Sequence, residues 1–337
     1  MRLRGPARLP GEVGGQALIG VNTWVWVSPL TDESLAALAP RIAGWGFDVV
    51  ELPVERPGEW DPARAAELLA GLGLGASVVL TMPPGRELVA ASPQVVRETQ
   101  DYLRHCVDVA VAVGAPAVSG PAYASVGRTW QMSPDERRAV YAELGENLKP
   151  VLAHAGEHGV RIGVEPLNRY ETSLLNTVEQ ALEALPADCG LALDTYHLNI
   201  EEKDPLRAVR LAGDRIAHIQ VCGTDRGAPG ADHFDWPGFA AAVRDTAYTG
   251  PLVIESFTSD NTTIATAASI WRPLAPSQDE LATDGLAFLR TLWSRPDGPA
   301  GQNAQPSMSP LPNPQHRTGT GAPSGDHSCE DHACSTS

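Results

Sequence analysis

The stretch RIGVEPLNRYETSLLNTVEQALEALPADCGLALD, residues 161–194, contains the smallest repeating unit of the fold. It begins with an apolar strand pattern at 161–166, continues with a helical pattern at 176–185 and ends with a second apolar strand pattern at 190–194. Two parallel strands need a long crossover, which is usually a helix, and such strands are buried on both faces. The stretch therefore predicts a β–α–β unit and an α/β protein.

The same alternation continues from Ala17 to Trp293. Eight strand patterns that alternate with eight helical patterns predict a single (β/α)₈ TIM barrel. An open, doubly wound sheet is the alternative, but the first strand runs into NTWVWVSP, which lacks the glycine-rich phosphate loop of such sheets. The predicted strands are 17–21, 48–52, 76–80, 116–120, 161–166, 190–194, 216–221 and 251–256, and the predicted helices are 32–45, 61–72, 94–113, 134–158, 176–185, 204–212, 236–246 and 279–293.

The composition excludes several classes of partner. The 337 residues carry a formal net charge of −16, whereas a protein that binds a nucleic-acid backbone needs a basic surface. No apolar run approaches the length of a transmembrane helix, and the N-terminus lacks the apolar core of a signal peptide. Five scattered cysteines form no disulfide framework, which indicates a reducing compartment. We therefore expect a cytoplasmic protein with neither a nucleic-acid nor a membrane partner.

The composition also predicts three segments along the chain. Residues 295–337 are rich in Pro, Gly, Ser, Asn and Gln and contain almost no large apolar side chains, which predicts a disordered tail. Residues 1–15 are a shorter flexible segment of the same kind. The barrel is expected at 16–294.

Four of the later strand patterns end in a polar side chain. In a (β/α)₈ barrel the carboxyl ends of all strands meet at one rim, where the functional groups lie. Side chains two residues apart in a strand share a face, so the small Gly163 and Ala192 leave room beneath this rim. The four polar residues are Glu165, Asp194, Gln220 and Glu255.

Three carboxylates that converge in a confined barrel mouth repel one another, and a divalent cation relieves that repulsion. Carboxylate and amide oxygens suit Mn²⁺ or Mg²⁺ better than Zn²⁺. The sequence therefore predicts a metal site made by Glu165, Asp194, Gln220 and Glu255.

Further polar residues follow the same strand ends. Glu171 lies in EPLNRYE, His197 lies in DTYHLNIEE, and Arg226 follows the strand at 216–221. Trp24, Trp26 and the loop around Trp271 and Arg272 are candidates for a pocket wall or a subunit contact.

The segments EPLNRYE, LDTYHLNIEE, HIQVCGTDRGAPG and IES together resemble the xylose-isomerase-like sugar isomerase/epimerase superfamily. Within it, they look most like the D-tagatose and D-psicose (ketose) 3-epimerases. The resemblance runs from Ala17 to Trp293, although the N-terminal half matches only in pattern. It implies a (β/α)₈ barrel with one Mn²⁺ or Co²⁺, a sugar substrate, and assembly as a homodimer or homotetramer.

The resemblance also implies residue roles. The metal ligands fall on the four residues at the strand ends, and Glu165 and Glu255 become the catalytic acid/base pair as well. The residues that contact the substrate are expected to be Glu171, His197 and Arg226.

The chain departs from the family in the strand at 216–221. The epimerases carry His-x-His there and use the second histidine as a metal ligand, whereas this chain has His218 and Gln220. We expect weaker metal binding and a stronger preference for Mn²⁺ or Mg²⁺, since an amide oxygen replaces an imidazole. His218 lies deeper on the same face, so it is either a support for Gln220 or for a carboxylate, or a packed core histidine.

The predicted chemistry is proton transfer through an enediolate. A metal polarises a sugar carbonyl, one carboxylate removes the neighbouring proton and a second carboxylate returns one. Return to the same carbon gives an epimerase, return to the neighbouring carbon gives an aldose–ketose isomerase, and loss of a β-substituent gives a lyase. We expect a sugar isomerase or epimerase that acts on an unphosphorylated ketose, because no Lys/Arg cluster lies beside the site. The alternatives are a lyase or dehydratase on a keto-sugar, keto-inositol or 3-keto-glycoside, and a non-catalytic sugar-binding barrel.

Overall fold

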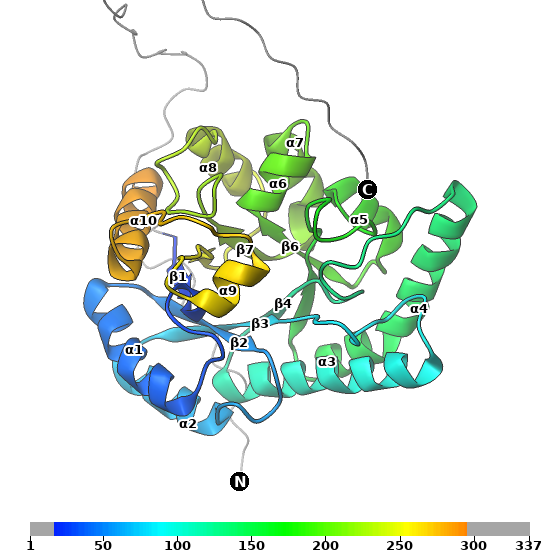
Figure 1. Ribbon diagram of the computed structural model, residues 1–337, viewed down its shortest axis with the longest axis horizontal. Helices are drawn as coiled ribbons and strands as arrows, with labels where there is room; N and C mark the ends of the chain where they lie inside the picture. The colour runs from blue at the N-terminus through cyan, green and yellow to red at the C-terminus, as the bar shows by residue number, and fades with distance from the viewer. Residues whose placement is uncertain (1–16, 295–337) are drawn as a thin grey trace, which may run out of the picture. The chain divides into compact units, whose positions relative to one another are not determined.

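Eight parallel strands close into a barrel in their order along the chain in the computed structural model, which describes residues 17–294 (Figure 1). The first strand pairs with both the second and the eighth, so the sheet has no edge. The predicted (β/α)₈ TIM barrel is confirmed. The strands are β1 (Ile19–Asn22), β2 (Val49–Val54), β3 (Gly75–Leu80), β4 (Ala117–Gly120), β5 (Arg161–Val164), β6 (Gly190–Asp194), β7 (Ile216–Val221) and β8 (Leu252–Ile254).

Helices surround this barrel, and each of the eight predicted helices has a counterpart. Two short helices, α6 and α9, and two 3₁₀ turns, η1 and η2, were not predicted. The helices are α1 (Asp32–Trp45), α2 (Pro62–Leu72), α3 (Pro93–Val113), α4 (Pro134–Glu157), α5 (Val178–Ala184), α6 (Thr195–Glu201), α7 (Pro205–Ala212), α8 (Trp236–Arg244), α9 (Thr262–Ala267) and α10 (Gln278–Trp293), and the 3₁₀ turns are η1 (Thr23–Val25) and η2 (Gly213–Arg215).

Local sequence signals fix the helix ends. Ser133 and Glu136 form a reciprocal capping box at the start of α4, and Asp61 caps α2 with a proline at the first helical position. Gly46 and Gly114 end α1 and α3 in the left-handed conformation, which glycine adopts without a steric cost.

The strand register brings polar residues together inside an otherwise apolar barrel. Asn22 of β1 and Ser77 of β3 are both aligned with Glu51 of β2. On the other side of the barrel, Asp194 of β6 is aligned with Gln220 of β7. Asn22, Asp194 and Gln220 lie at or near the carboxyl ends of their strands, the rim where TIM barrels carry their functional groups, whereas Glu51 and Ser77 lie deeper, in the middle of theirs.

The predicted flexible segments 1–15 and 295–337 lie outside the described residues. Within residues 17–294, no helix is both long enough and apolar enough to cross a membrane.

Candidate active site

The four residues predicted at the strand ends lie together at the barrel mouth. Glu165 follows β5, Asp194 ends β6, Gln220 lies in β7 and Glu255 follows β8, and each is at most 5% exposed. The Gln220 Nε2 donates to Glu255 Oε1 at 2.7 Å. One oxygen each of Glu165 and Asp194 and a ring nitrogen of His197 lie within 4.8 Å of one another, a spacing suited to a metal ion.

Burial and mutual repulsion set the electrostatics of these carboxylates. Burial raises the pKa of Glu165 well above its usual value, and the neighbouring Asp194 raises it further. The pKa of Glu255 is also raised well above its usual value by burial, even though Arg226 opposes the shift. At neutral pH, a site with raised carboxyl pKa values can hold a proton on one glutamate while the other acts as a base.

Arg226 is the cation that touches this carboxylate cluster. Its Nη1 pairs with Asp194 and lies 3.2 Å from Glu255 Oε2. Its guanidinium also lies over the ring of Phe257, 4.8 Å from the centroid. The backbone at Arg226 has φ +69°, an unfavourable conformation for a side chain larger than glycine, and such strain is concentrated at functional sites.

His197 lies among Asn168, Arg226 and Glu165. The backbone N–H of Asn168 donates to its Nδ1 at 3.0 Å, and its Nε2 lies 3.2 Å from Arg226 Nη2, which also carries only donor hydrogens. That Nε2 is 3.5 Å from Glu165 Oε1. Burial lowers the pKa of His197, and Arg226 lowers it further, so the ring is neutral at pH 7. Asn168 also donates from its side chain to Glu171 Oε1 at 2.6 Å, which links the predicted substrate residues.

Sequence reasoning missed Glu51, a fully buried carboxylate beneath the mouth. It accepts hydrogen bonds from Asn22 Nδ2 at 2.8 Å and from Gln220 Nε2 at 2.9 Å. His218 Nε2 lies 2.6 Å from Glu51 Oε1, so His218 supports a carboxylate that the sequence analysis did not consider. The segment VVELPV places one acid in an apolar strand, but nothing in that strand alone assigns the acid to the site.

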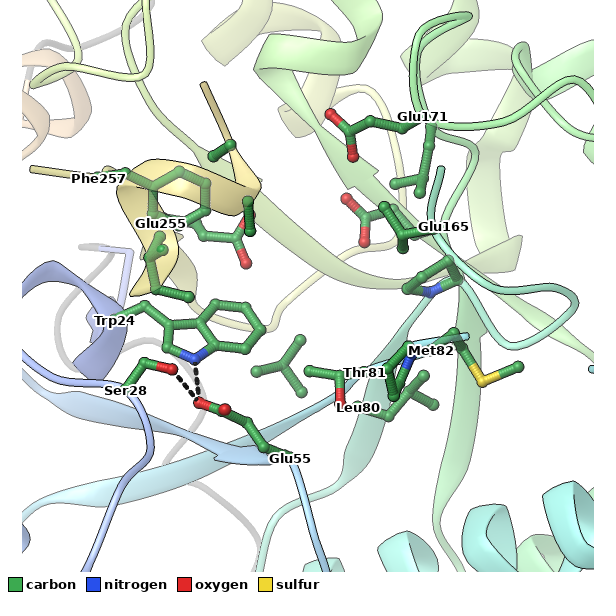
Figure 2. Close-up of a pocket in the computed structure, with 18 of the residues that line it drawn as sticks. Trp24, Ser28, Glu55, Leu80, Thr81, Met82, Glu165, Glu171, Glu255 and Phe257 are labelled. Atoms are coloured by element: carbon green, nitrogen blue, oxygen red, sulfur yellow. Dashed lines mark hydrogen bonds between the residues drawn. The ribbon is translucent and has the colours of Figure 1, made fainter. Parts of the chain in front are cut away.

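A cavity of about 370 Å³ opens above the carboxylates. Figure 2 shows Glu165 and Glu255 pointing toward one another across it, with Glu171 beside Glu165. Glu55 lies at its other end and accepts hydrogen bonds from Trp24 Nε1 and Ser28 Oγ at 2.9 and 2.7 Å. Most of the apolar side chains in the wall were not predicted from the sequence. The apolar wall includes Trp24, Val79, Leu80, Met82, Leu167, Phe257, Ile264 and Ala268.

The donor set fits a divalent cation. The buried Gln220 Oε1 has no hydrogen-bond partner among the residues that the structure describes, although a buried carbonyl oxygen normally has one. The three nearby carboxylates are the hard oxygen ligands that Mn²⁺ and Mg²⁺ prefer. An unpartnered amide oxygen close to buried carboxylates is therefore well suited to bind such an ion.

Several sugar 3-epimerases are similar to this chain along most of its length. A probable ketose 3-epimerase of Synechocystis is 35% identical over 81% of this chain and 96% of its own length. An L-ribulose 3-epimerase of Methylomonas is 31% identical over 85% of this chain and 98% of its own length. A crystal structure of a D-allulose 3-epimerase from Methylomonas in complex with D-allulose is 28% identical, has a TM-score of 0.74, and covers 82% of this chain and 97% of its own.

Residues 40–292 match the family described as the xylose isomerase-like TIM barrel. That match covers β2 to β8 with Glu165, Asp194, Gln220 and Glu255, and the chain belongs to the xylose isomerase-like TIM barrel family.

Proposed function

We propose that this protein is a divalent-metal-dependent sugar epimerase that acts on an unphosphorylated ketose. The observation that carries the proposal is the pair of buried glutamates, Glu165 and Glu255, which face one another across the cavity. The similarity to ketose 3-epimerases along most of the chain supports the same reaction class.

The two glutamates carry out the proton transfer. One carboxylate removes the proton from the carbon next to the sugar carbonyl, and the other delivers a proton to the same carbon from the opposite face. This exchange inverts the carbon and leaves the sugar formula unchanged. Burial raises the pKa of both Glu165 and Glu255, which makes each a stronger base than an exposed carboxylate.

The proposed metal ligands are Glu165, Asp194, Gln220 and Glu255, and the proposed ion is Mn²⁺. Bound there, the ion would polarise the substrate carbonyl and stabilise the negative charge that develops on its oxygen.

Three further residues are proposed to orient the sugar. Glu171 lines the cavity beside Glu165 and accepts hydroxyl hydrogens. His197 lines the cavity, and its Nδ1 is held by the Asn168 backbone N–H. Arg226 lines the cavity as a cationic donor and is fixed by its contacts to Asp194 and Glu255.

Two of the three arginines that line the cavity, Arg86 and Arg226, are held by other contacts, which favours an unphosphorylated substrate, while the third, Arg56, is exposed and lies 3.9 Å from Glu59. Arg86 donates to the backbone oxygens of Thr81 and Glu55, both at 2.8 Å, and its guanidinium stacks on a tyrosine ring. Arg226 is paired with carboxylates. A phosphate group would have to compete with these existing contacts.

Deuterium exchange tests the proposal. We expect the Mn²⁺-loaded protein, incubated in D₂O with a panel of ketoses, to incorporate one deuterium into the recovered ketose and its epimer. Mass spectrometry detects the label, and NMR identifies the carbon that carries it.

The controls are Glu165→Gln and Glu255→Gln, which remove the base but keep the side-chain shape. Each should lower exchange by at least about 10²-fold while circular dichroism shows an intact barrel. Full exchange in both variants would exclude the glutamate pair. Loss of water or an aglycone from a keto-sugar, without epimer formation, would identify a lyase instead.

A further inference from the structure

Glu51 is an acid that the proposed proton transfer does not use. Its carboxylate is fully buried and contacts side chains from β1, β3 and β7: Asn22 Nδ2 at 2.8 Å, Ser77 Oγ at 3.1 Å, and both Gln220 Nε2 and His218 Nε2. Asn22 and Gln220 donate to its Oε2 and Ser77 donates to its Oε1, so both oxygens of Glu51 act as hydrogen-bond acceptors. The barrel therefore places a buried carboxylate next to Gln220 of the candidate metal site.

This anion constrains the amide of Gln220. The NH₂ group of Gln220 donates to Glu51 Oε2 at 2.9 Å and to Glu255 Oε1 at 2.7 Å. An amide rotated by 180° would place its carbonyl oxygen against two carboxylate oxygens, which can only accept hydrogen bonds. Both donors of Gln220 are thus satisfied, and its buried Oε1 is left without a partner among the described residues.

We propose that Glu51 is a positioning residue that fixes the amide of Gln220 so that its carbonyl oxygen faces the metal ion. The inference rests on the proposed metal site. An imidazole at this position would offer a ring nitrogen to the metal, whereas a glutamine offers a ligand only in one of its two amide orientations. A glutamine at position 220 therefore requires a neighbouring hydrogen-bond acceptor to hold its NH₂ group, and the Glu51 carboxylate is that acceptor.

The test is the Mn²⁺ affinity of the full-length protein, measured by electron paramagnetic resonance of free Mn²⁺. In Glu51→Gln the new carboxamide can donate as well as accept, so Gln220 loses its preferred orientation. We expect Mn²⁺ to bind about tenfold or more weakly, the size of effect seen when residues that support metal ligands are removed. Ser77→Ala is the matched control, because it removes a hydrogen bond to the same carboxylate without touching Gln220, and it should change the affinity less than about threefold.

The same substitution in a Gln220→His variant shows whether Glu51 acts through the orientation of the Gln220 amide or through the general integrity of the site. In Gln220→His the ligand does not depend on amide orientation, so adding Glu51→Gln should cost clearly less affinity than it costs in the wild type. An equal cost in both backgrounds, or an unchanged affinity in Glu51→Gln, would overturn the inference. If Glu51→Gln does not fold, Glu51→Asp replaces it, with a smaller expected loss. A wild-type protein that binds no Mn²⁺ would overturn the proposed metal site itself.

A separate cluster of metal-binding side chains lies on the outside of the barrel, where α3 contacts α4. His154 and His158 are one helical turn apart at the end of α4, and their rings are 4.5 Å apart. Asp108 of α3 lies 2.7 Å from His154 Nε2 through its Oδ1. One ligand atom from each of the three residues lies within 4.8 Å of the others.

Two features favour a cation at this cluster. His158 Nδ1 is bound to the backbone oxygen of His154 at 2.8 Å, which leaves Nε2 as a basic nitrogen with a free lone pair. The cluster also lies at the C-terminal end of α4, where the helix dipole attracts positive charge. We infer that Asp108, His154 and His158 form a surface site for Zn²⁺ or a similar imidazole-binding ion that connects α3 to α4.

The number of Zn²⁺ ions per chain tests this site, counted by competition with a chromophoric chelator in the Mn²⁺-loaded protein. We expect one fewer Zn²⁺ at micromolar concentrations in His158→Asn and in Asp108→Asn than in the wild type, with unchanged epimerase activity. The control is His233→Asn, which removes an exposed histidine of a loop and should keep the wild-type count. The same count in all four proteins would exclude the site.

Discussion

At the scale of single residues, the barrel mouth is governed by charge balance. Arg226 is 5% exposed and contacts Asp194 and Glu255, so without a metal it is the nearest compensation for those carboxylates. Removing one partner of a buried ion pair typically costs about 3–5 kcal/mol. We expect Arg226→Met to destabilise the metal-free protein by that amount, measured by urea unfolding in EDTA, and to lose much less stability when Mn²⁺ is present.

The matched control is Arg210→Met. Arg210 donates to Asp245 at 2.8 Å, but both side chains are about half exposed, and such pairs contribute roughly 0–1 kcal/mol. An equal, small loss in both variants would contradict the role of Arg226 as the internal counter-charge.

The residues at the strand ends could be predicted, whereas Glu51 could not. Glu165, Asp194 and Glu255 each follow an apolar run, and the barrel geometry alone brings such positions together. Glu51 is a single acid within an apolar strand, and its meaning depends on Asn22 and Gln220, which reach it only after the barrel closes. Contacts between distant strands leave no periodic signal in the sequence.

At the scale of elements, the strands were predicted well because apolar runs between turn residues define them. The two missed helices are short and lack a periodic apolar face. The helix α6 (Thr195–Glu201) is capped by Asp194, whose Oδ1 accepts a hydrogen bond from the Tyr196 N–H at 2.8 Å. One side chain therefore both caps α6 and belongs to the carboxylate cluster at the barrel mouth. Thr262–Ala267 forms a wall of the cavity and consists mostly of threonine and alanine.

Gly120 links the end of β4 to the active site. It has φ +135°, and an added Cβ would lie 2.8 Å from the Leu80 backbone oxygen. Its own oxygen accepts the Glu165 N–H at 3.0 Å. We expect Gly120→Ala to destabilise the protein by more than about 2 kcal/mol, through backbone strain and steric overlap, and to lower the kcat of the remaining folded protein by moving Glu165. Thermal unfolding and steady-state kinetics measure the two effects.

Gly145 provides the control, because its replacement by alanine is expected to raise the stability of the protein and not lower it. Gly145 lies inside α4, and the nearest atom to an added Cβ is 3.9 Å away. Gly145→Ala should therefore stabilise the protein by about 0.5–1 kcal/mol and leave kcat unchanged. Equal effects of the two substitutions would show that Gly120 is not conformationally required.

At the scale of the whole molecule, closure of the barrel couples segments that are distant in sequence. Cys106 of α3, Cys189 just before β6 and Cys222 just after β7 are all buried on different parts of the barrel. Burial raises the pKa of Cys106 and of Cys189 to about 12, and it raises the pKa of Cys222 well above its usual value. Only the thiolate reacts with iodoacetamide, so these three thiols should be unreactive at pH 8 in the native protein.

Urea should expose the three thiols together. A closed barrel cannot release β7 without breaking its pairing with both β6 and β8, so unfolding is expected as one cooperative transition. Peptide mass spectrometry after a labelling pulse at each urea concentration should give the same midpoint for Cys106, Cys189 and Cys222. Earlier labelling of Cys222 alone would reveal local opening at the mouth. In that case the strand that carries Gln220 would be less stable than the rest of the barrel, and added Mn²⁺ should move its midpoint toward that of the other two thiols.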